Sequence, residues 1–366
     1  MLNNKTVAVV VPAYNEEKQI GMVIETMPDF VDRIIIVNDL SKDKTSDVVL
    51  KYIEIDNSVK KIIQNKQLME FQSTRYNRAE EVLHIQGSEE IRLFNPSEVA
   101  NKKEETDRII LINHKINGGV GGAIATGYKW CKDHAIDCTA VMAGDGQMDP
   151  SELESLCNPV VYEGIDYVKG NRLIHRSAWL VIPKTRYFGN SILSILTKLA
   201  SGYWRVSDTQ TGYTATSNAA LNAIRLHDIY RSYGMPNDML VKLNIAMCTI
   251  REIPIKPVYK VGEESKMKIG KVIPRISWLL FKSFYKRLWI KYLFRDFHPL
   301  FLLYNYAFIS LLISLPYLIK IIASFITNEH LSYEPLLAFI FLFTSSFQSL
   351  LFAMWMDIQD NERLYK

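Results

Sequence analysis

A single carboxylate, Asp145, stands between two glycines in residues 141–150, VMAGDGQMDP. An apolar run enters this stretch and a proline ends it, a pattern typical of a strand that runs into a tight loop. An acid in such a loop can bind a hard divalent cation, with Gln147 and two phosphate oxygens of a ligand completing the oxygen shell. The alternative is a structural turn, because aspartate and glycine are also common turn residues.

Two other stretches carry polar or flexible residues where a ligand can approach. Asp39 in VNDLSKDKT can accept hydrogen bonds from a base or a ribose, or its segment can cap the helix that follows Ser41. Gly119 and Gly121 in GGVGGAIATG start a G-x-G pattern, but Ile124 occupies the place of the third glycine, which excludes a dinucleotide fingerprint. The glycines then either let the backbone and a helix N-terminus approach an anion or serve strand-helix packing alone.

The elements that must position these residues follow from hydrophobic periodicity. Short β-branched runs at 6–14, 33–39, 108–114 and 138–145 predict strands, and residues 16–27 and 115–134 between them have helical spacing. Strands that alternate with helices indicate a parallel sheet covered by helices. Ligands of such sheets bind at the carboxyl ends of the strands, which is where the polar residues fall. Further on, we expect a strand at 166–173, helices at 187–202 and 237–248, and a polar loop entering a short strand at 207–217.

A polar stretch interrupts this pattern between the second and third strands. Residues 52–107 are rich in Lys, Glu, Asn and Gln, and we interpret them as an inserted surface subdomain whose role the sequence does not tell. Within it, LHIQG at 83–87 and EEIRLFNP at 89–96 predict a small hairpin. We find no internal repeat.

Charge and hydropathy point to a membrane. The net charge of +4 over 366 residues is too small to indicate a nucleic-acid partner, but residues 265–295 contain Lys and Arg and no acid. Two uncharged apolar runs follow, 299–319 and 335–356, each about the length that crosses a bilayer. They predict a transmembrane hairpin, with a pair of buried helices in a soluble core as the alternative. The basic flank predicts that both ends of the hairpin are cytosolic.

The segment 271–297 alternates aromatic and apolar residues with Lys and Arg, which suits a membrane interface with cations on lipid phosphates. The alternative is that these cations only follow the positive-inside bias and bind anionic lipids generically. The polar start of the chain leads directly into a strand, so we expect no signal peptide and a cytosolic catalytic part. Four cysteines without metal-site spacing predict ordinary thiols of a reducing compartment.

The order and spacing of VVVPAYNEE, VNDLSKDKT, INGGVGGAIATGY, AGDGQMDP, GNRL, SDTQTGY and NDM resembles the GT-A glycosyltransferases of family 2. With the hairpin behind it, the chain looks like the polyprenyl-phosphate glycosyltransferases, the group that includes dolichol-phosphate mannose synthase. The resemblance covers residues 5–260 apart from the insert. It implies a GT-A fold, a Rossmann-like, mostly parallel α/β sheet flanked by helices. The implied division is a catalytic domain at 1–260, basic amphipathic helices at 261–297, and two membrane helices with a short tail at 298–366.

The resemblance also implies roles for individual residues. Asp145, Asp208 and Asp238 would be catalytic, and Asp145 and Gln147 would bind Mg²⁺ or Mn²⁺. The basic stretch before the hairpin, rather than the resemblance, makes Lys266 and Lys268, which lie furthest from the membrane helix, the candidates for contact with the acceptor phosphate. The nucleotide-sugar would be bound by Pro12, Ala13, Tyr14, Glu16, Asp39, Gly119, Gly121 and Arg172. One departure weakens the expectation of strict metal dependence, because Ala143 stands where the family's D-x-D motif usually has its first acid. Gln147, phosphates, water or Asp149 must then complete the shell.

The implied reaction is transfer of a sugar, with inversion, from a nucleotide-sugar to a polyprenyl phosphate at the cytosolic face of the inner (plasma) membrane. A lipid phosphate needs no strong general base, whereas a sugar hydroxyl would require Asp238 to take its proton. Two alternatives stay open: a related enzyme that extends a lipid-linked saccharide or another glycan, and a catalytically silent scaffold. The sequence does not tell the sugar, the nucleotide base or the acceptor chain length, and it leaves a homo-oligomer open. Membrane lipids are expected partners and nucleic acids are not.

Overall fold

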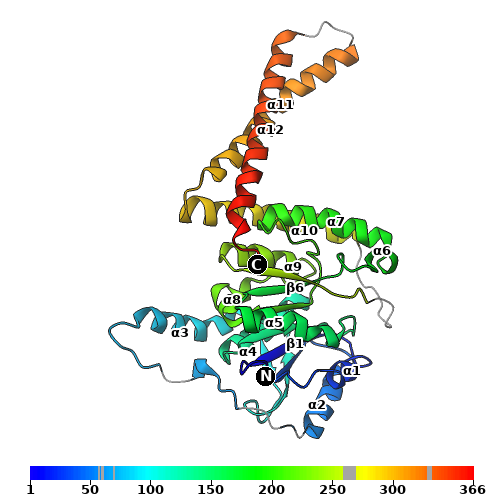
Figure 1. The fold of residues 1–366 in the computed structure, drawn as a ribbon, viewed down its shortest axis with the longest axis vertical. Coiled ribbons are helices and arrows are strands. Elements are labelled where there is room, and N and C mark those ends of the chain that lie inside the picture. The colour runs from blue at the N-terminus through cyan, green and yellow to red at the C-terminus, as the bar shows by residue number, and fades with distance from the viewer. Residues whose placement is uncertain (57, 59–61, 69–70, 259–268, 328–331) are drawn as a thin grey trace.

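The computed structural model describes residues 1–56, 58, 62–68, 71–258, 269–327 and 332–366. Within them an eight-stranded mixed sheet has the order β3-β4-β2-β1-β5-β7-β6-β8 (Figure 1). The strands are β1 Val7–Ala13, β2 Arg33–Asn38, β3 Ser97–Val99, β4 Ile109–His114, β5 Cys138–Val141, β6 Tyr167–Asn171, β7 Thr214–Ser217 and β8 Ile250–Pro254. β1 pairs in parallel with β2 and β5, and β2 pairs in parallel with β4. β7 runs antiparallel to both β5 and β6, so β6 points the same way as β5.

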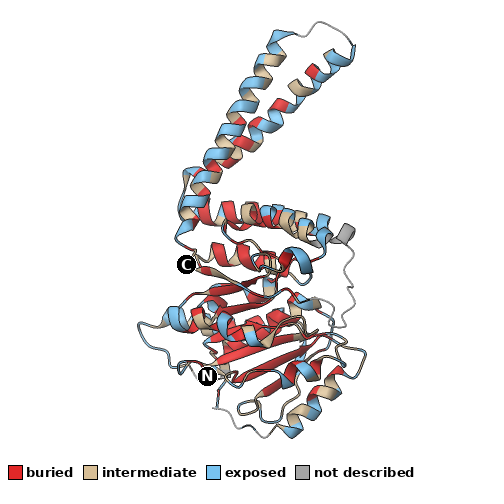
Figure 2. Ribbon diagram, turned by 45° about the vertical axis from the view of Figure 1, so that its right-hand side comes forward, coloured by how far each residue is buried: buried red, intermediate tan, exposed pale blue. Residues whose placement is uncertain are grey.

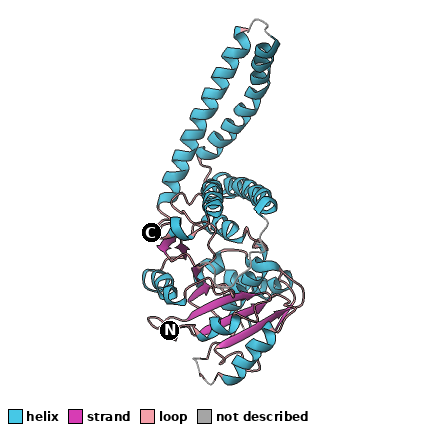
Figure 3. Cartoon of the chain, turned by 90° about the vertical axis from the view of Figure 1, so that its right-hand side faces the viewer, coloured by secondary structure: helices cyan, strands magenta, loops and turns pink. Residues whose placement is uncertain are grey.

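Helices cover both faces of the sheet, and Figure 3 shows the strands as a layer between them. The longer helices of this part are α2 Thr45–Ile55, α3 Arg78–Glu90, α4 Gly119–Asp133, α5 Leu153–Glu163, α7 Lys184–Ser201 and α9 Met235–Ile245. Shorter ones are α1 Ile20–Glu25, α6 Ala178–Val181 and α8 Asn218–Ala223, with 3₁₀ turns η1 Lys66–Leu68, η2 Ile91–Leu93, η3 Pro150–Glu152 and η4 Leu226–Asp228. Alternate residues of β1 enter different cores: Val9 packs with one cluster and Val10 with the other. A strand buried on both faces explains the continuous apolar run VAVVVPA.

The predicted fold class is confirmed, and so are the strands and helices predicted around the motifs. The four cysteines are buried free thiols, also as expected. The hairpin predicted at 83–96 is wrong, because these residues belong mostly to helix α3 and turn η2. A short alternation cannot distinguish strand from helix, and Glu80 and Glu81 in the first turn favour the helix at its N-terminus.

The C-terminal part consists of α10 Ile269–Arg287, a π-helical segment η5 Leu288–Arg295, and two long helices, α11 Pro299–Thr327 and α12 Tyr333–Glu362. α11 and α12 lie side by side and project away from the sheet, while α10 lies across their long axis (Figure 1). α11 and α12 are each long and apolar enough to cross a membrane. Only 17% of the most apolar stretch of α11 is buried, and only 11% of that of α12. Exposed and half-buried residues run along both helices (Figure 2), which argues against the alternative of a soluble core.

A buried ion pair ties this hairpin to α10. Arg287 donates to both carboxylate oxygens of Asp357 on α12, at 2.7 and 2.8 Å, and both side chains are completely buried. Lys291 is also buried and pairs with Asp360 at 3.1 Å. The expectation that the cations of 271–297 all face lipid phosphates is therefore wrong for these two, because α12 supplies their acids. Arg275, Lys282, Lys286 and Arg295 are exposed, as that expectation requires.

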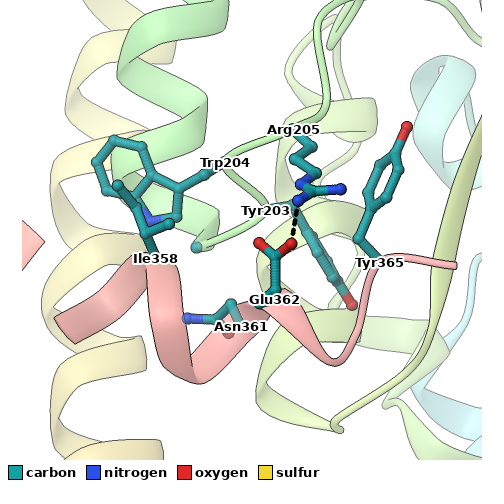
Figure 4. A pocket seen from close by; sticks show the side chains of 8 residues that line it. Tyr203, Trp204, Arg205, Ile358, Asn361, Glu362 and Tyr365 are labelled. Carbon is teal, nitrogen blue, oxygen red and sulfur yellow. Dashed lines mark hydrogen bonds and ion pairs between the residues drawn. The ribbon is translucent and has the colours of Figure 1, made fainter. Parts of the chain in front are cut away.

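The last residues of the chain return to the catalytic part. Beyond α12, Ile250 of β8 donates its N–H to the Leu364 carbonyl at 2.7 Å, and Lys366 donates back to Ile250 at 3.0 Å. A small pocket lies at this junction, where the side chains of Arg205 and Glu362 form an ion pair (Figure 4). Both ends of the hairpin are thus attached to the sheet-containing part, which is compatible with the prediction that both lie on one side of a membrane.

Candidate active site

The fold gathers the predicted site residues of several strands at one edge of the sheet. Asp39 and Asp145 follow β2 and β5, and Arg172 follows β6. Because β7 runs in the opposite direction, Asp208 precedes it and reaches the same edge. Segments that lie more than a hundred residues apart in the chain, such as those of Asp39 and Asp145, therefore meet where parallel strands end, as the sequence pattern predicted.

Asp39 is a buried carboxylate held by two donors. Its Oδ1 lies 2.8 Å from Nδ1 of His114 and accepts the Gly118 N–H at 2.6 Å. The other ring nitrogen of His114 lies 2.9 Å from the hydroxyl of Thr126 on α4. Sequence reasoning missed His114, although its place at the end of an apolar strand was a usable signal. This chain of contacts fixes the orientation of Asp39 at the carboxyl edge, where Asp39 is proposed to meet a base or ribose.

The loops after β1 and β2 are joined by side chain to backbone hydrogen bonds. The N–H of Asn15 donates to Ser41 at 3.0 Å, and the N–H of Glu16 donates to Thr45 at 2.9 Å. Asn15 has a φ of 57° and Leu40 has a φ of 60°, a left-handed conformation that is costly for leucine. Strained residues of this kind cluster at ligand sites, and Tyr14 beside them is 37% exposed. The nucleotide-binding loop predicted at 12–16 is thus pre-shaped by its neighbour.

The Asp145 loop lies beside the end of β1, since a Cβ on Gly144 would be 3.2 Å from the Pro12 carbonyl oxygen. Asp145 is half-buried, and its Oδ1 accepts the backbone N–H of Gln147 at 3.1 Å. Asp149 is used differently: its carboxylate caps η3 through the Ser151 N–H at 2.9 Å and pairs with Lys256 at 3.2 Å. These contacts, the Ser151 hydrogen bond first, lower the pKa of Asp149.

The residues of this loop fit a metal that is shared with a substrate. Among the described residues, no group of three or more His, Cys, Asp or Glu side chains gathers as a metal cage. Mg²⁺ commonly takes one or two carboxylates and completes its shell with substrate phosphates and water. Asp145 fits this arrangement, whereas Asp149 is occupied by its cap and by Lys256.

Arg172 is held by a fully buried carboxylate. Its Nε and one terminal nitrogen donate to the two oxygens of Asp208, at 2.8 and 3.1 Å, and its backbone N–H adds a third bond at 3.1 Å. Burial acts to raise the pKa of Asp208, but the Arg172 guanidinium and the hydrogen bonds outweigh burial, so the pKa lies below its usual value. The Arg172 side chain is 23% exposed and Asp208 is not exposed at all. Asp208 is therefore buried behind the partly exposed Arg172 side chain, and its expected contact with sugar and acceptor stays a prediction.

Two further charged residues lie next to this pair, and sequence reasoning missed both. Lys169 in β6 is completely buried and donates from Nζ to the Thr211 carbonyl oxygen. Glu252 in β8 is its direct register partner and accepts the backbone N–H groups of Ser207 and Asp208, at 3.0 and 3.1 Å. A lysine in the middle of an apolar strand was the available signal for Lys169.

Gly119 and Gly121 make their closest approach to the chain itself. A Cβ on Gly119, which has a φ of 71°, would lie 2.4 Å from the Arg231 carbonyl oxygen, and one on Gly121 would lie 2.0 Å from that of Tyr230. Asp238 at the start of α9 holds the same loop, because its Oδ2 accepts the Tyr230 N–H at 2.9 Å and pairs with Lys242. This geometry favours the alternative in which both glycines serve packing. It also shows that Asp238 holds the loop through Tyr230 and pairs with Lys242. Binding and catalytic roles for these residues stay predictions.

Gly121→Ala tests the packing of α4 on this loop. Two backbones would have to separate to admit the methyl group, so we expect a loss of about 1–3 kcal/mol in the free energy of unfolding. Gly122→Ala is the matched control, since its nearest contact is the Asn95 side chain at 3.3 Å and alanine is the better helix former. Chemical denaturation of both variants measures the difference, and equal stabilities would contradict the packing role.

The acceptor residues predicted from the sequence, Lys266 and Lys268, lie outside the described residues.

The sequence profile described as Glycosyl transferase family 2 matches residues 8–77 and 95–225, which is more than half of the chain. The matched ranges contain the loops after β1, β2, β4, β5 and β6 and the segment before β7. The unmatched residues between them, 78–94, coincide with α3 and η2 and fall within the insert predicted at 52–107. Asp238 lies beyond the matched range.

Three relatives are similar to this chain over different lengths. A UDP-N-acetylglucosamine–dolichyl-phosphate N-acetylglucosaminyltransferase of Methanococcus voltae is 28% identical over 79% of this chain and 97% of its own length. An undecaprenyl-phosphate mannosyltransferase of Micrococcus luteus is 28% identical over 45% of this chain and 68% of its own. A dolichyl-phosphate beta-glucosyltransferase of Trichomonas vaginalis is 24% identical over 76% of this chain and 74% of its own.

Proposed function

The chain belongs to glycosyl transferase family 2, and on this premise we propose that it transfers a sugar from a nucleotide-sugar to a polyprenyl phosphate at a membrane surface. The acceptor class is supported by what the three relatives have in common. Their names give three different sugars, N-acetylglucosamine, mannose and glucose, but each acceptor is a dolichyl or undecaprenyl phosphate. The comparison therefore favours a polyprenyl phosphate while leaving the sugar open.

The observation that carries the proposal is the outward-facing apolar hairpin fixed to a family 2 catalytic part. An acceptor with a polyprenyl tail stays in the bilayer, so an enzyme anchored beside the bilayer meets its phosphate at the interface. Aromatic side chains are enriched at such interfaces, and Trp179 on α6, Phe188 on α7 and Trp278 on α10 are all more than half exposed. α7 and α10 lie together across the base of the hairpin (Figure 1).

We propose that α11 and α12 each cross the membrane and that the catalytic part is cytosolic. Exposed cations, among them Lys282, Lys286 and Arg295, precede α11, which follows the positive-inside bias. The proposed division has a catalytic part at 1–260, a membrane-surface part at 261–297, and the spans with their tail at 298–366. We also propose that the membrane is the inner (plasma) membrane. This orientation then puts the site on the cytosolic side, where nucleotide-sugars are made.

In the proposed reaction the donor lies along the carboxyl edge of the sheet. Asp39, fixed by His114 and Gly118, accepts hydrogen bonds from the base or ribose, and the loop 12–16 covers the nucleotide. Arg172 presents a guanidinium, oriented by Asp208, to the diphosphate. As the bond between the anomeric carbon and the diphosphate oxygen breaks, negative charge grows on the leaving nucleoside diphosphate, and a fixed guanidinium stabilises it.

The Asp145 carboxylate, with Gln147 beside it, would hold a divalent cation such as Mg²⁺ or Mn²⁺. A bound cation supplies Lewis-acid stabilisation of the diphosphate's charge. The protein's own contribution is to hold this carboxylate at the end of β5, next to the β1 loop, where a diphosphate reaches it.

The acceptor phosphate forms the new bond to the anomeric carbon with inversion. A phosphomonoester has a second pKa of about 6, so it is ionised at neutral pH and brings its own nucleophilic oxygen. No strong general base is then needed, which agrees with Asp238 being paired with Lys242 and bonded to the Tyr230 N–H. A base role for Asp238 belongs to the alternative in which the acceptor is a sugar hydroxyl.

The test is turnover by the full-length protein in detergent, with Mg²⁺ or Mn²⁺, undecaprenyl phosphate and a panel of radiolabelled UDP- and GDP-sugars. We expect a labelled lipid from which mild acid releases the sugar, because a glycosyl phosphodiester is acid-labile and a glycoside is not. Undecaprenol is the matched control acceptor, since it has the same tail without the phosphate, and it should take no label.

The other outcomes separate the alternatives. Acid-stable label on a lipid-linked saccharide, with none on undecaprenyl phosphate, would favour the enzyme that extends a glycan. Nucleotide-sugar binding without transfer to either kind of acceptor would favour a silent scaffold. Both results would contradict the proposed acceptor.

A further inference from the structure

We propose that Lys169 and Glu252 are positioning residues for sugar transfer, because together they hold the buried Asp208 that orients Arg172. This inference rests on the proposed function for its catalytic consequence, although the contacts themselves do not. Lys169 and Glu252 face each other across β6 and β8, directly beside the strand end from which Arg172 projects. Neither residue belongs to the motifs that the sequence analysis singled out.

Glu252 fixes the backbone on which Asp208 stands. Its two carboxylate oxygens accept the N–H of Ser207, at 3.0 Å to each, and one of them accepts the N–H of Asp208 at 3.1 Å. Asn171, the last residue of β6, donates its side-chain amide to Glu252 at 2.8 Å. The carboxylate thus joins the segment entering Asp208 to the strand that ends just before Arg172.

Lys169 holds the other side of the same segment. Its ammonium donates to the carbonyl oxygen of Thr211, three residues after Asp208, and no part of the side chain is exposed. Asp208 in turn accepts the bidentate pair of bonds from Arg172. The segment 207–211 is therefore fixed by Glu252 at one end and by Lys169 at the other. Asp208, which pairs with Arg172, lies in this segment.

The charges of the four side chains balance only when Lys169 carries its proton. Lys169 and Arg172 are then positive, and Asp208 and Glu252 are negative. Burial raises the pKa of Glu252, so loss of the Lys169 charge would favour protonation of Glu252. A protonated Glu252 has less capacity to accept the N–H groups of Ser207 and Asp208. Removing the ammonium should therefore disturb the support of Asp208, and through it Arg172.

This arrangement gives the reaction an alkaline limit. Burial lowers the pKa of Lys169 to about 8, against the opposing effect of Asp208 and Glu252, while Arg172 lowers it further. The ammonium that supports Arg172 is present below this pH and is lost as the pH rises through it. The turnover number should therefore fall as the pH rises through this value. This alkaline limb of the pH profile should be absent in a variant whose residue 169 cannot titrate.

Lys169→Met is the first test, because methionine is about as long as lysine and has no charge. A misplaced catalytic group can cost up to about a hundredfold, so we expect kcat to fall about ten- to a hundredfold while the donor KM stays within about threefold. Lys129→Met is the matched control: it also removes a buried lysine, which pairs with Asp133 on α4, and should leave kcat within about threefold. An equal loss in both variants would mean general damage to the fold and would overturn the inference.

A second measurement needs no sugar transfer. Phenylglyoxal modification of Arg172, followed by mass spectrometry, should be at least about threefold faster in Lys169→Met than in the wild type. The rate at Arg205, which is more than half exposed, should be unchanged. An unchanged rate at Arg172 would overturn the inference even if the wild type proved to use another acceptor. Failure of the wild type to label undecaprenyl phosphate would instead refute the proposed function.

The double variant Lys169→Met/Glu252→Gln keeps the test valid if the single variant does not fold. It removes one charge of each sign, so it leaves no uncompensated acid in the interior. We expect it to have a kcat above that of Lys169→Met and no alkaline limb near pH 8. Persistence of the limb in the double variant would overturn the role assigned to Lys169.

Discussion

Asp145→Ala should lower kcat/KM for sugar transfer by about a thousandfold, which corresponds to about 4 kcal/mol of transition-state stabilisation. The substitution removes the carboxylate that the Asp145 loop offers to a divalent cation. Ala143 stands where a second acid would precede Asp145, so no neighbouring carboxylate at that position replaces the lost charge. The fold should change little, because the carboxylate is only half-buried and the hydrogen bond that it accepts from the Gln147 N–H is worth about 1 kcal/mol.

Asp149→Ala is the matched control for this experiment. It removes a carboxylate four positions further along the same loop, but one that caps η3 and pairs with Lys256. We expect a stability loss of about 1 kcal/mol and less than about a tenfold change in activity. Steady-state kinetics with undecaprenyl phosphate and the donor found in the panel measure both variants. If Asp145→Ala kept more than a tenth of the wild-type activity, or if Asp149→Ala were the more damaging change, the assigned ligand would be wrong.

Asp357→Ala should destabilise the protein by about 3–5 kcal/mol, because it leaves the Arg287 guanidinium buried without its carboxylate. Asp357 also accepts the Tyr292 hydroxyl at 2.8 Å and the Asn361 amide at 2.8 Å, so several donors lose their partner together. The pair joins α10 to the end of α12, and its loss should loosen the hairpin from the catalytic part. Thermal and chemical unfolding of the full-length protein in detergent measure the effect.

Glu362→Gln provides the comparison on the same helix. Glu362 pairs with Arg205, but both side chains are about half exposed, so the pair should be worth less than about 1 kcal/mol. Equal effects of Asp357→Ala and Glu362→Gln would show that burial does not strengthen the first pair. A proteolysis experiment adds a readout of geometry, since cleavage between the hairpin and α10 should become faster only in Asp357→Ala.

The sequence determined the parts of this protein that are encoded locally. The VAVVVPA and RIIIVN runs are buried on both faces, so the central strands were readable from continuous hydrophobicity. The order of strands and helices placed Asp39, Asp145 and Arg172 at one edge, because parallel strands end on the same side. The two uncharged apolar runs fixed the hairpin through their length alone. The helix α3 was missed since the five residues 83–87 fit either period.

Only the tertiary structure decided which charges are buried and with which partner. Arg287 and Lys291 lie in a run of basic residues that the sequence predicted to face lipid, yet Asp357, 70 residues beyond Arg287, and Asp360 neutralise them inside the protein. Asp208 is the buried partner of Arg172, and strand register places Lys169 beside Glu252. The physical reason is that a buried charge is stable only beside an opposite charge or several donors, and the fold brings those together from distant parts of the chain.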